Sequence, residues 1–210
     1  WELVFCEMYA GGKYNNASNG SYEYSLGLNG LGLCATQYAS EYMDVDVRTG
    51  DTRYTLHFEK GENVGGLHQE PYKGKSGTKI RWQPDLSVFT DINIPLEYYL
   101  DIIKRQAIVN EGIRFVLRNQ TGGKFETTEF LYQQGIVDHV RELAGEDAMT
   151  SVQFWQAERN VRDRDDKPEY KTKINVALAF SNRNHQIEYY HNSSWLEHGG
   201  APDKAVRSAF

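Results

Sequence analysis

The sequence predicts an α+β fold built on antiparallel sheets, and three patterns support this prediction. Apolar and polar residues alternate on both sides of a turn at 49–51, and again on both sides of a turn at 121–123, which is typical of β-hairpins. Between the hairpins, residues 96–107 carry an apolar stripe at helical spacing after Pro95, a residue that suits a first helical turn. Helices that alternate with antiparallel hairpins favour an α+β fold over a parallel nucleotide-binding sheet.

The other elements of the first half follow from the same periodicities. The alternation of the first hairpin comes from Val45, Val47, Tyr54, Leu56 and Phe58. The second hairpin is expected to run from 113 to 117, through the turn at 121–123, and from 125 onward. We expect helices at 1–10, 31–42 and 96–107, a strand at 78–82, and a loop in the Gly-rich, polar stretch 59–75.

A second unit is expected to begin at residue 127, which divides the chain into domains 1–126 and 127–210. Residues 135–143 have helical spacing, whereas 152–154, 174–180 and 187–189 alternate as strands. These patterns predict another antiparallel sheet with a helix on it. The stretch 158–173 is densely charged but nearly balanced, which is typical of a solvated loop. Residues 201–210 are expected to begin a further helix.

Composition restricts the class of protein. The chain has 210 residues, of which 40% are hydrophobic and 25% charged, so it can form one good core or two small ones. Its net charge of −6 argues against DNA binding by this chain alone, because nonspecific affinity comes mostly from Lys and Arg. Two cysteines without a paired motif favour a reducing compartment, and no apolar run reaches the roughly 18 residues of a membrane span. We therefore expect a cytoplasmic location and no membrane partner.

No metal or nucleophile motif is visible. The six histidines, at 57, 68, 139, 185, 191 and 198, show no metal-ligand spacing, so satisfied or surface histidines are expected. We predict no catalytic residue and no metal ligand within the chain.

The most informative motif is Gly27-Leu28-Asn29-Gly30-Leu31-Gly32, which runs directly into the helix-compatible stretch 33–39. Glycines let the backbone approach an anion closely, and a helix that starts there directs free N–H groups and the positive end of its dipole at a phosphate. The order of glycines differs from both the dinucleotide fingerprint and the Walker loop. The motif favours a phosphate cradle, with a plain packing turn as the alternative.

Further segments accompany this motif in a fixed order. They are Gly11-Gly12-Lys13 with the polar stretch 15–21, then 76–85, 105–113, 132–136 and 198–200. Together they resemble the B subunits of bacterial type IIA DNA topoisomerases, gyrase and topoisomerase IV, within the GHKL superfamily. The resemblance implies the C-terminal part of a GHKL (Bergerat) ATPase α/β sandwich at 1–126. It also implies the N-terminal part of a transducer, a domain like ribosomal protein S5 domain 2, at 127–210.

The resemblance also implies which residues contact ATP. Lys13 matches a cation of the ATP lid, Tyr22 a tyrosine near the adenosine, and Thr78 a threonine at the adenine ring. The full set is Gly12, Lys13, Tyr22, Gly27, Leu28, Asn29, Gly30, Leu31, Gly32 and Thr78. Arg48 matches an arginine at the pocket rim that aminocoumarin inhibitors touch. Two positions depart from the family: Asn29 stands where most gyrases have His, and Leu26 replaces a glycine.

The function implied is that of an ATP-dependent type II topoisomerase B subunit, with ATP and Mg²⁺ as cofactors. In that family the base glutamate, the Mg²⁺-binding asparagine and the adenine-reading aspartate precede the lid, so this chain alone is expected to be inactive. Because it opens at Trp1, we expect it to be part of a longer polypeptide. The implied partners are the topoisomerase A subunit, a second B subunit and DNA in the holoenzyme, and we expect self-association through the second unit.

Two alternatives to this function remain open. One is a non-catalytic coupling or dimerisation module, and the other is a GHKL ATPase of the chaperone or mismatch-repair type. The segments that would distinguish gyrase from topoisomerase IV are not in the sequence.

Overall fold

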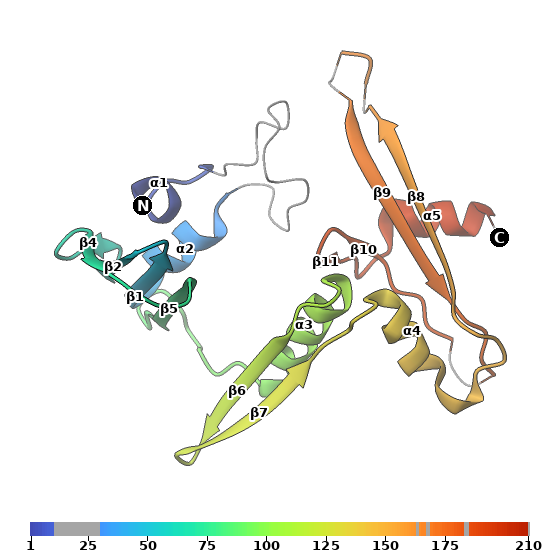
Figure 1. Ribbon diagram of the computed structural model, residues 1–210, viewed down its shortest axis with the longest axis horizontal. Coiled ribbons are helices and arrows are strands. Elements are labelled where there is room, and N and C mark those ends of the chain that lie inside the picture. The colour runs from blue at the N-terminus through green and yellow to red at the C-terminus, as the bar shows by residue number, and fades with distance from the viewer. Residues whose placement is uncertain (11–29, 163, 167–168, 183–184, 210) are drawn as a thin grey trace. The chain divides into compact units, whose positions relative to one another are not determined.

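The computed structural model describes residues 1–10, 30–162, 164–166, 169–182 and 185–209. Their contacts group them into two compact units, one up to Asn93 and one from Ile94 onward. Figure 1 shows the elements of each unit. This division lies ahead of the domain boundary expected after residue 126, which stays a prediction. No described helix is long and apolar enough to cross a membrane.

The first unit is an antiparallel sheet centred on β1 (Ser40–Thr49). On one side β1 pairs with β2 (Thr52–Glu59) through a tight turn at Gly50, whose φ of +60° suits glycine. On the other side it pairs with the edge strand β5 (Gly77–Pro84). The short strands β3 (Glu62–Asn63) and β4 (His68–Pro71) pair with β2. The hairpin and the strand at 78–82 are therefore confirmed.

One face of this sheet carries the core of the first unit. The buried side chains that form it are Phe5, Met43, Val45, Leu56 and Phe58. Phe5 belongs to α1 (Glu2–Phe5), and Leu33 of α2 (Gly32–Tyr38) packs against the same cluster. Full burial of an apolar side chain of this size contributes about 1.5–3 kcal/mol. The core therefore holds both short helices against the face of the sheet that carries Met43 and Val45 of β1.

Three expectations for the first unit were wrong. The helix expected at 1–10 ends at Phe5, and Tyr9 has a positive φ of 61°, which no helix accommodates. The helix expected at 31–42 ends at Tyr38, because Ser40 and Tyr42 already pair with β5. The stretch 59–75 is not all loop, since β3 and β4 lie in it; both are polar and short, so they show no apolar alternation.

The second unit begins with a helix and a hairpin, two elements that the sequence predicted within the first half of the chain. Helix α3 (Leu96–Val109) precedes β6 (Phe115–Thr121) and β7 (Lys124–Phe130), which pair antiparallel. The buried residues Ala107 and Ile108 of α3 pack with Tyr132, which follows β7. This small core fixes α3 against the hairpin.

The remaining elements are helices and two further strand pairs. They are α4 (Ile136–Ala144), the 3₁₀ turn η1 (Gly145–Asp147), β8 (Gln153–Val161), β9 (Tyr170–Leu178), β10 (Tyr190–His191), β11 (Ser194–Trp195) and α5 (Gly200–Ala209). β8 pairs with β9 and β10 with β11. The helices expected at 135–143 and 201–210 are confirmed, the latter over its described residues.

Two expectations for the second unit were wrong. Much of the charged stretch 158–173 is strand, because β8 runs to Val161 and β9 starts at Tyr170, and pairs such as Lys171 Nζ with Glu158 Oε2 at 3.0 Å join the two. Cross-strand ion pairs let charged residues occupy exposed strands. The strand expected at 187–189 lies instead at 190–191, where it pairs with β11 and not with the β8–β9 sheet.

Candidate functional site

Five of the predicted site residues lie in the part of the chain that the structure describes: Gly30, Leu31, Gly32, Arg48 and Thr78. The others lie outside the described residues: Gly12, Lys13, Tyr22, Gly27, Leu28 and Asn29.

The described end of the glycine motif forms the start of α2. Gly30 has a φ of +59°, and Leu31 is the N-cap residue. The first helical bond runs from Ala35 N to Leu31 O at 2.8 Å, and no described side chain caps this end. The amides of the first turn therefore have no partner within the helix. Gly32 is exposed, and a Cβ built on it meets no atom within 4 Å among the described residues. The start of α2 thus leaves backbone N–H groups accessible to an anion.

Thr78 lies on the same face of the sheet as α2. It is the cross-strand partner of Val47, and directly opposed residues of an antiparallel pair point to the same side. Val47 and Leu33 both pack against the core cluster of the first unit. Because Thr78 is exposed, its hydroxyl is free to contact a ligand on this face. The structure therefore brings Thr78 and the start of α2 to one side of the sheet.

Arg48 follows Val47 on β1 and so points to the opposite face. Its Nε lies 3.4 Å from Asp46 Oδ1, and its guanidinium carbon lies 5.9 Å from the centre of the Tyr72 ring. Its partner on the edge strand is Gly77, and a Cβ built there would lie 3.7 Å from Arg48 Nη2. Arg48 is therefore beside the edge of the sheet next to Thr78, but the structure does not bring the two side chains together.

The outer face of the sheet holds a charged network. Arg53 donates to Asp46 Oδ2 from Nη2 at 2.9 Å and to Glu70 Oε1 from Nη1 at 2.7 Å. The hydrogen bond from Arg53 lowers the pKa of Asp46. His57 Nδ1 lies 2.7 Å from Asp44 Oδ1, and this contact raises the pKa of the imidazole. These groups neutralise one another, so this face has no cluster of one sign.

A polar cluster in the second unit, which forms around the buried side chains of Tyr132 and His139, was not predicted from the sequence. Tyr132 donates from its hydroxyl to Glu142 Oε2 at 2.6 Å, and His139 Nε2 lies 3.3 Å from Glu188 Oε2. The imidazole of His139, aided by a hydrogen bond from Tyr190, lowers the pKa of Glu188 to about 2. Glu188 and His139 are far apart in the sequence, and the only signal was a histidine on the apolar side of a predicted helix.

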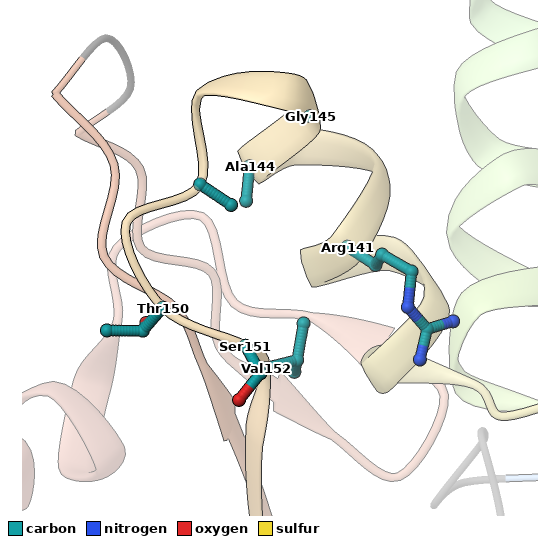
Figure 2. A pocket seen from close by; sticks show the side chains of 7 residues that line it. Arg141, Ala144, Gly145, Thr150, Ser151 and Val152 are labelled. Atoms are coloured by element: carbon teal, nitrogen blue, oxygen red, sulfur yellow. The ribbon is translucent and has the colours of Figure 1, made fainter.

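A pocket of about 230 Å³ lies where α4 ends (Figure 2). Its lining consists of Arg141, Ala144, Gly145, Ala148, Thr150, Ser151 and Val152. Arg141 is its one charged residue, and this side chain already donates from Nη1 to Asp138 Oδ1 at 2.6 Å. No group of three His, Cys, Asp or Glu side chains that could hold a metal ion occurs among the described residues. The pocket therefore offers no pair of groups for acid–base or nucleophilic chemistry.

Comparison with known proteins identifies relatives of this chain. The chain is 29% identical over 143 residues to the B subunit of DNA topoisomerase 4 from Salmonella typhimurium, an alignment that covers 67% of the chain and 22% of the relative. It is 30% identical over 142 residues to the B subunit of DNA gyrase from Synechocystis, covering 66% and 13%. The chain thus spans less than a quarter of the length of these two relatives. No protein-family model matches it.

A solved structure shows the same fold. The 43K ATPase domain of Thermus thermophilus gyrase B, solved in complex with an aminocoumarin, superposes with a TM-score of 0.69 at 21% identity, over 86% of this chain and 48% of that one. The α+β prediction is confirmed. The chain is related in sequence to the B subunits of DNA topoisomerase IV and DNA gyrase, and it shares the fold of part of the gyrase B ATPase domain.

Proposed function

We propose that this chain contributes the ATP lid and the phosphate cradle of a type II topoisomerase B subunit, and that it couples ATP binding to DNA strand passage. One observation carries the proposal. The accessible amides at the start of α2 and the exposed hydroxyl of Thr78 lie on one face of the sheet. A polyphosphate on these amides and a base near Thr78 would engage the two ends of one nucleotide. The sequence similarity to the B subunits of topoisomerases supports the choice of ATP.

The residues present fit a phosphate group. No atom of the described residues lies within 4 Å of the place where a side chain of Gly32 would stand, and the positive end of the α2 dipole favours a negative charge there. The nucleotide supplies the hydrolysable bond, and this chain would hold its phosphates. Mg²⁺ coordination and the general base are not assigned to residues of this chain. We propose that the chain alone does not hydrolyse ATP.

The remaining parts of the proposal concern the larger assembly. Residues 1–126 would belong to the ATPase domain and 127–210 to the transducer. The A subunit, a second B subunit and DNA would be partners of the intact enzyme. In the second unit, Trp155 and Val176 are opposed across β8–β9, lie on the same face as Ile174, and are exposed. Exposed apolar strand residues of this kind favour association with a second copy of the chain.

Replacing Thr78 by Val tests the face that we assign to the nucleotide. Valine keeps the β-branched shape and removes the hydroxyl, so ATP affinity of the intact protein is expected to fall about three- to tenfold, as for one lost hydrogen bond. Thr55→Val is the matched control, because Thr55 opposes Asp46 and lies on the other face of the same sheet. An equal loss of affinity in both variants, or in neither, would contradict the assignment. A titration with a fluorescent ATP analogue measures it.

A further inference from the structure

Residues 188–195 form a small hairpin that we name the helix clasp. Tyr190 pairs with Trp195 and His191 with Ser194, and Leu196 N donates to Tyr189 O at 2.8 Å at its base. Asn192 takes the left-handed conformation in the turn, with a φ of 53°, which asparagine tolerates better than most residues. The clasp is therefore a closed unit with its own backbone hydrogen bonds.

The tip and second strand of the clasp bind α3. Gln106 donates from Nε2 to Ser193 O at 2.9 Å. The guanidinium carbon of Arg105 lies 3.5 Å from the centre of the Trp195 ring, which is a close stacking distance. Arg105 is itself oriented by a 2.8 Å hydrogen bond from Nε to Asp101 Oδ2. Two neighbouring residues of α3 are thus occupied by the clasp.

The two residues that precede the first strand of the clasp, Glu188 and Tyr189, contact two other helices. Glu188 Oε2 lies 3.3 Å from His139 Nε2 on α4 and accepts a 2.6 Å hydrogen bond from the hydroxyl of Tyr190. The hydroxyl of Tyr189 donates to Asp203 Oδ1 on α5 at 3.2 Å. Adjacent residues of the clasp therefore contact α4 and α5, while its other end contacts α3.

A hairpin that bonds to three helices at once ties their local stability together. Opening any one helix from the clasp leaves partly buried polar groups without partners, and losing such a partner costs more free energy than losing a fully exposed hydrogen bond. A direct contact adds to this, since Lys104 of α3 donates from Nζ to Glu142 Oε1 of α4 at 2.8 Å. Cooperative units of this kind open together in native-state hydrogen exchange.

We infer that the helix clasp is a coupling element: it makes α3, α4 and α5 open and move as one cooperative unit. By the domain division expected from sequence, α3 belongs to the nucleotide-binding part and α4 and α5 to the transducer part. The clasp would then carry a displacement of α3 directly into the transducer. The cooperative unit itself rests on contacts within the second unit and not on nucleotide binding, so it and the proposed function can fail separately.

Native-state hydrogen exchange of the 210-residue chain tests the clasp from both ends. Tyr189→Phe removes only the hydroxyl that binds α5, and Gln106→Ala removes only the amide that binds the tip from α3. In each variant, exchange is expected to rise about three- to tenfold in α3, α4 and α5 together, the factor that corresponds to one lost hydrogen bond.

The control is Tyr98→Phe, which makes the same chemical change as Tyr189→Phe at a tyrosine of α3 that is 64% exposed. This variant should leave the exchange rates of all three helices unchanged. An increase confined to α5 in Tyr189→Phe, or to α3 in Gln106→Ala, would overturn the inference. So would unchanged exchange in all three helices. ATP is absent from the experiment, so neither result depends on the proposed nucleotide site.

Discussion

Gly30 is the residue on which the start of α2 depends most. Its φ of +59° is readily adopted by glycine and costs a residue with a Cβ about 1–2 kcal/mol. By our proposal, a larger side chain at this position would also hinder a phosphate that approaches the first-turn amides. Both the backbone conformation and the proposed phosphate contact therefore favour glycine here.

Gly30→Val is expected to lower the ATP affinity of the intact protein about tenfold or more, because a displaced phosphate loses charge-assisted hydrogen bonds. Gly122→Val is the matched control: Gly122 has a φ of +58° in the β6–β7 turn, so the backbone strain is the same. Both variants should lose similar stability by thermal unfolding. Normal affinity in a folded Gly30→Val protein would mean that the glycine motif is only a packing turn.

Through Glu188, the stability of the second unit is expected to depend on pH. Its pKa falls from the ordinary 4.5 to about 2 in the folded state, chiefly through His139. A lowered pKa means that the folded state favours the ionised form, so the stabilisation is complete above pH 4.5 and disappears as the pH falls toward 2. Glu188→Gln is therefore expected to be less stable than the native protein at about pH 7 and equally stable near pH 2.

Denaturant unfolding at a series of pH values measures this difference. Glu197→Gln, a change at an exposed glutamate of the same unit, serves as the control and should leave the pH profile unchanged. A difference between Glu188→Gln and the native protein that stays constant from neutral pH down to the pKa of Glu188 would show that the glutamate acts by shape and not by charge.

At the level of single residues, the proposed nucleotide site was only partly predictable from the sequence. The motifs indicated Gly30–Gly32 and Thr78, whereas the pairing of Thr78 with Val47 depends on the register between β1 and β5, which the structure supplies. This register separates Arg48 from Thr78, which a motif read without its strand register does not show. The contact between Glu188 and His139 could not be predicted from the sequence, because only the tertiary fold brings these two residues together.

Secondary-structure elements with a buried face were the ones that the sequence predicted well. The β1–β2 hairpin was predictable because Val45, Leu56 and Phe58 alternate over a common core, and α3 because its stripe ends in the buried Ala107 and Ile108. Elements without a buried face, such as β4, leave no such pattern. The ends of β8 and β9 were hidden because ion pairs replace apolar contacts there.

The β8–β9 hairpin carries the prediction that belongs to this scale. Ile174→Lys adds a charge to the apolar face that includes Trp155 and Val176, so it is expected to shift the chain toward monomer. Asn175→Lys adds the same charge to the opposite face of β9 and should leave association unchanged. Sedimentation velocity over a concentration series measures both; a native chain that is monomeric at every concentration would contradict self-association through this face.

At the scale of the whole molecule, the chain combines two compact units and matches about half of a solved gyrase B ATPase domain. Its net charge of −6 agrees with our proposal that this part of the intact protein handles a nucleotide, and that other parts contact DNA. The fold class was predictable because each unit repeats a pattern of helix and hairpin.

Hydrogen exchange of the intact protein with and without a non-hydrolysable ATP analogue tests the central claim most directly, because the claim concerns backbone amides. We predict that the analogue slows exchange by about fivefold or more in peptides that contain the first turn of α2, with a smaller effect in β5 around Thr78, and leaves the outer strand β4 unchanged. Saturating binding of the analogue with unchanged exchange in both α2 and β5 would contradict the assignment of this face to the nucleotide.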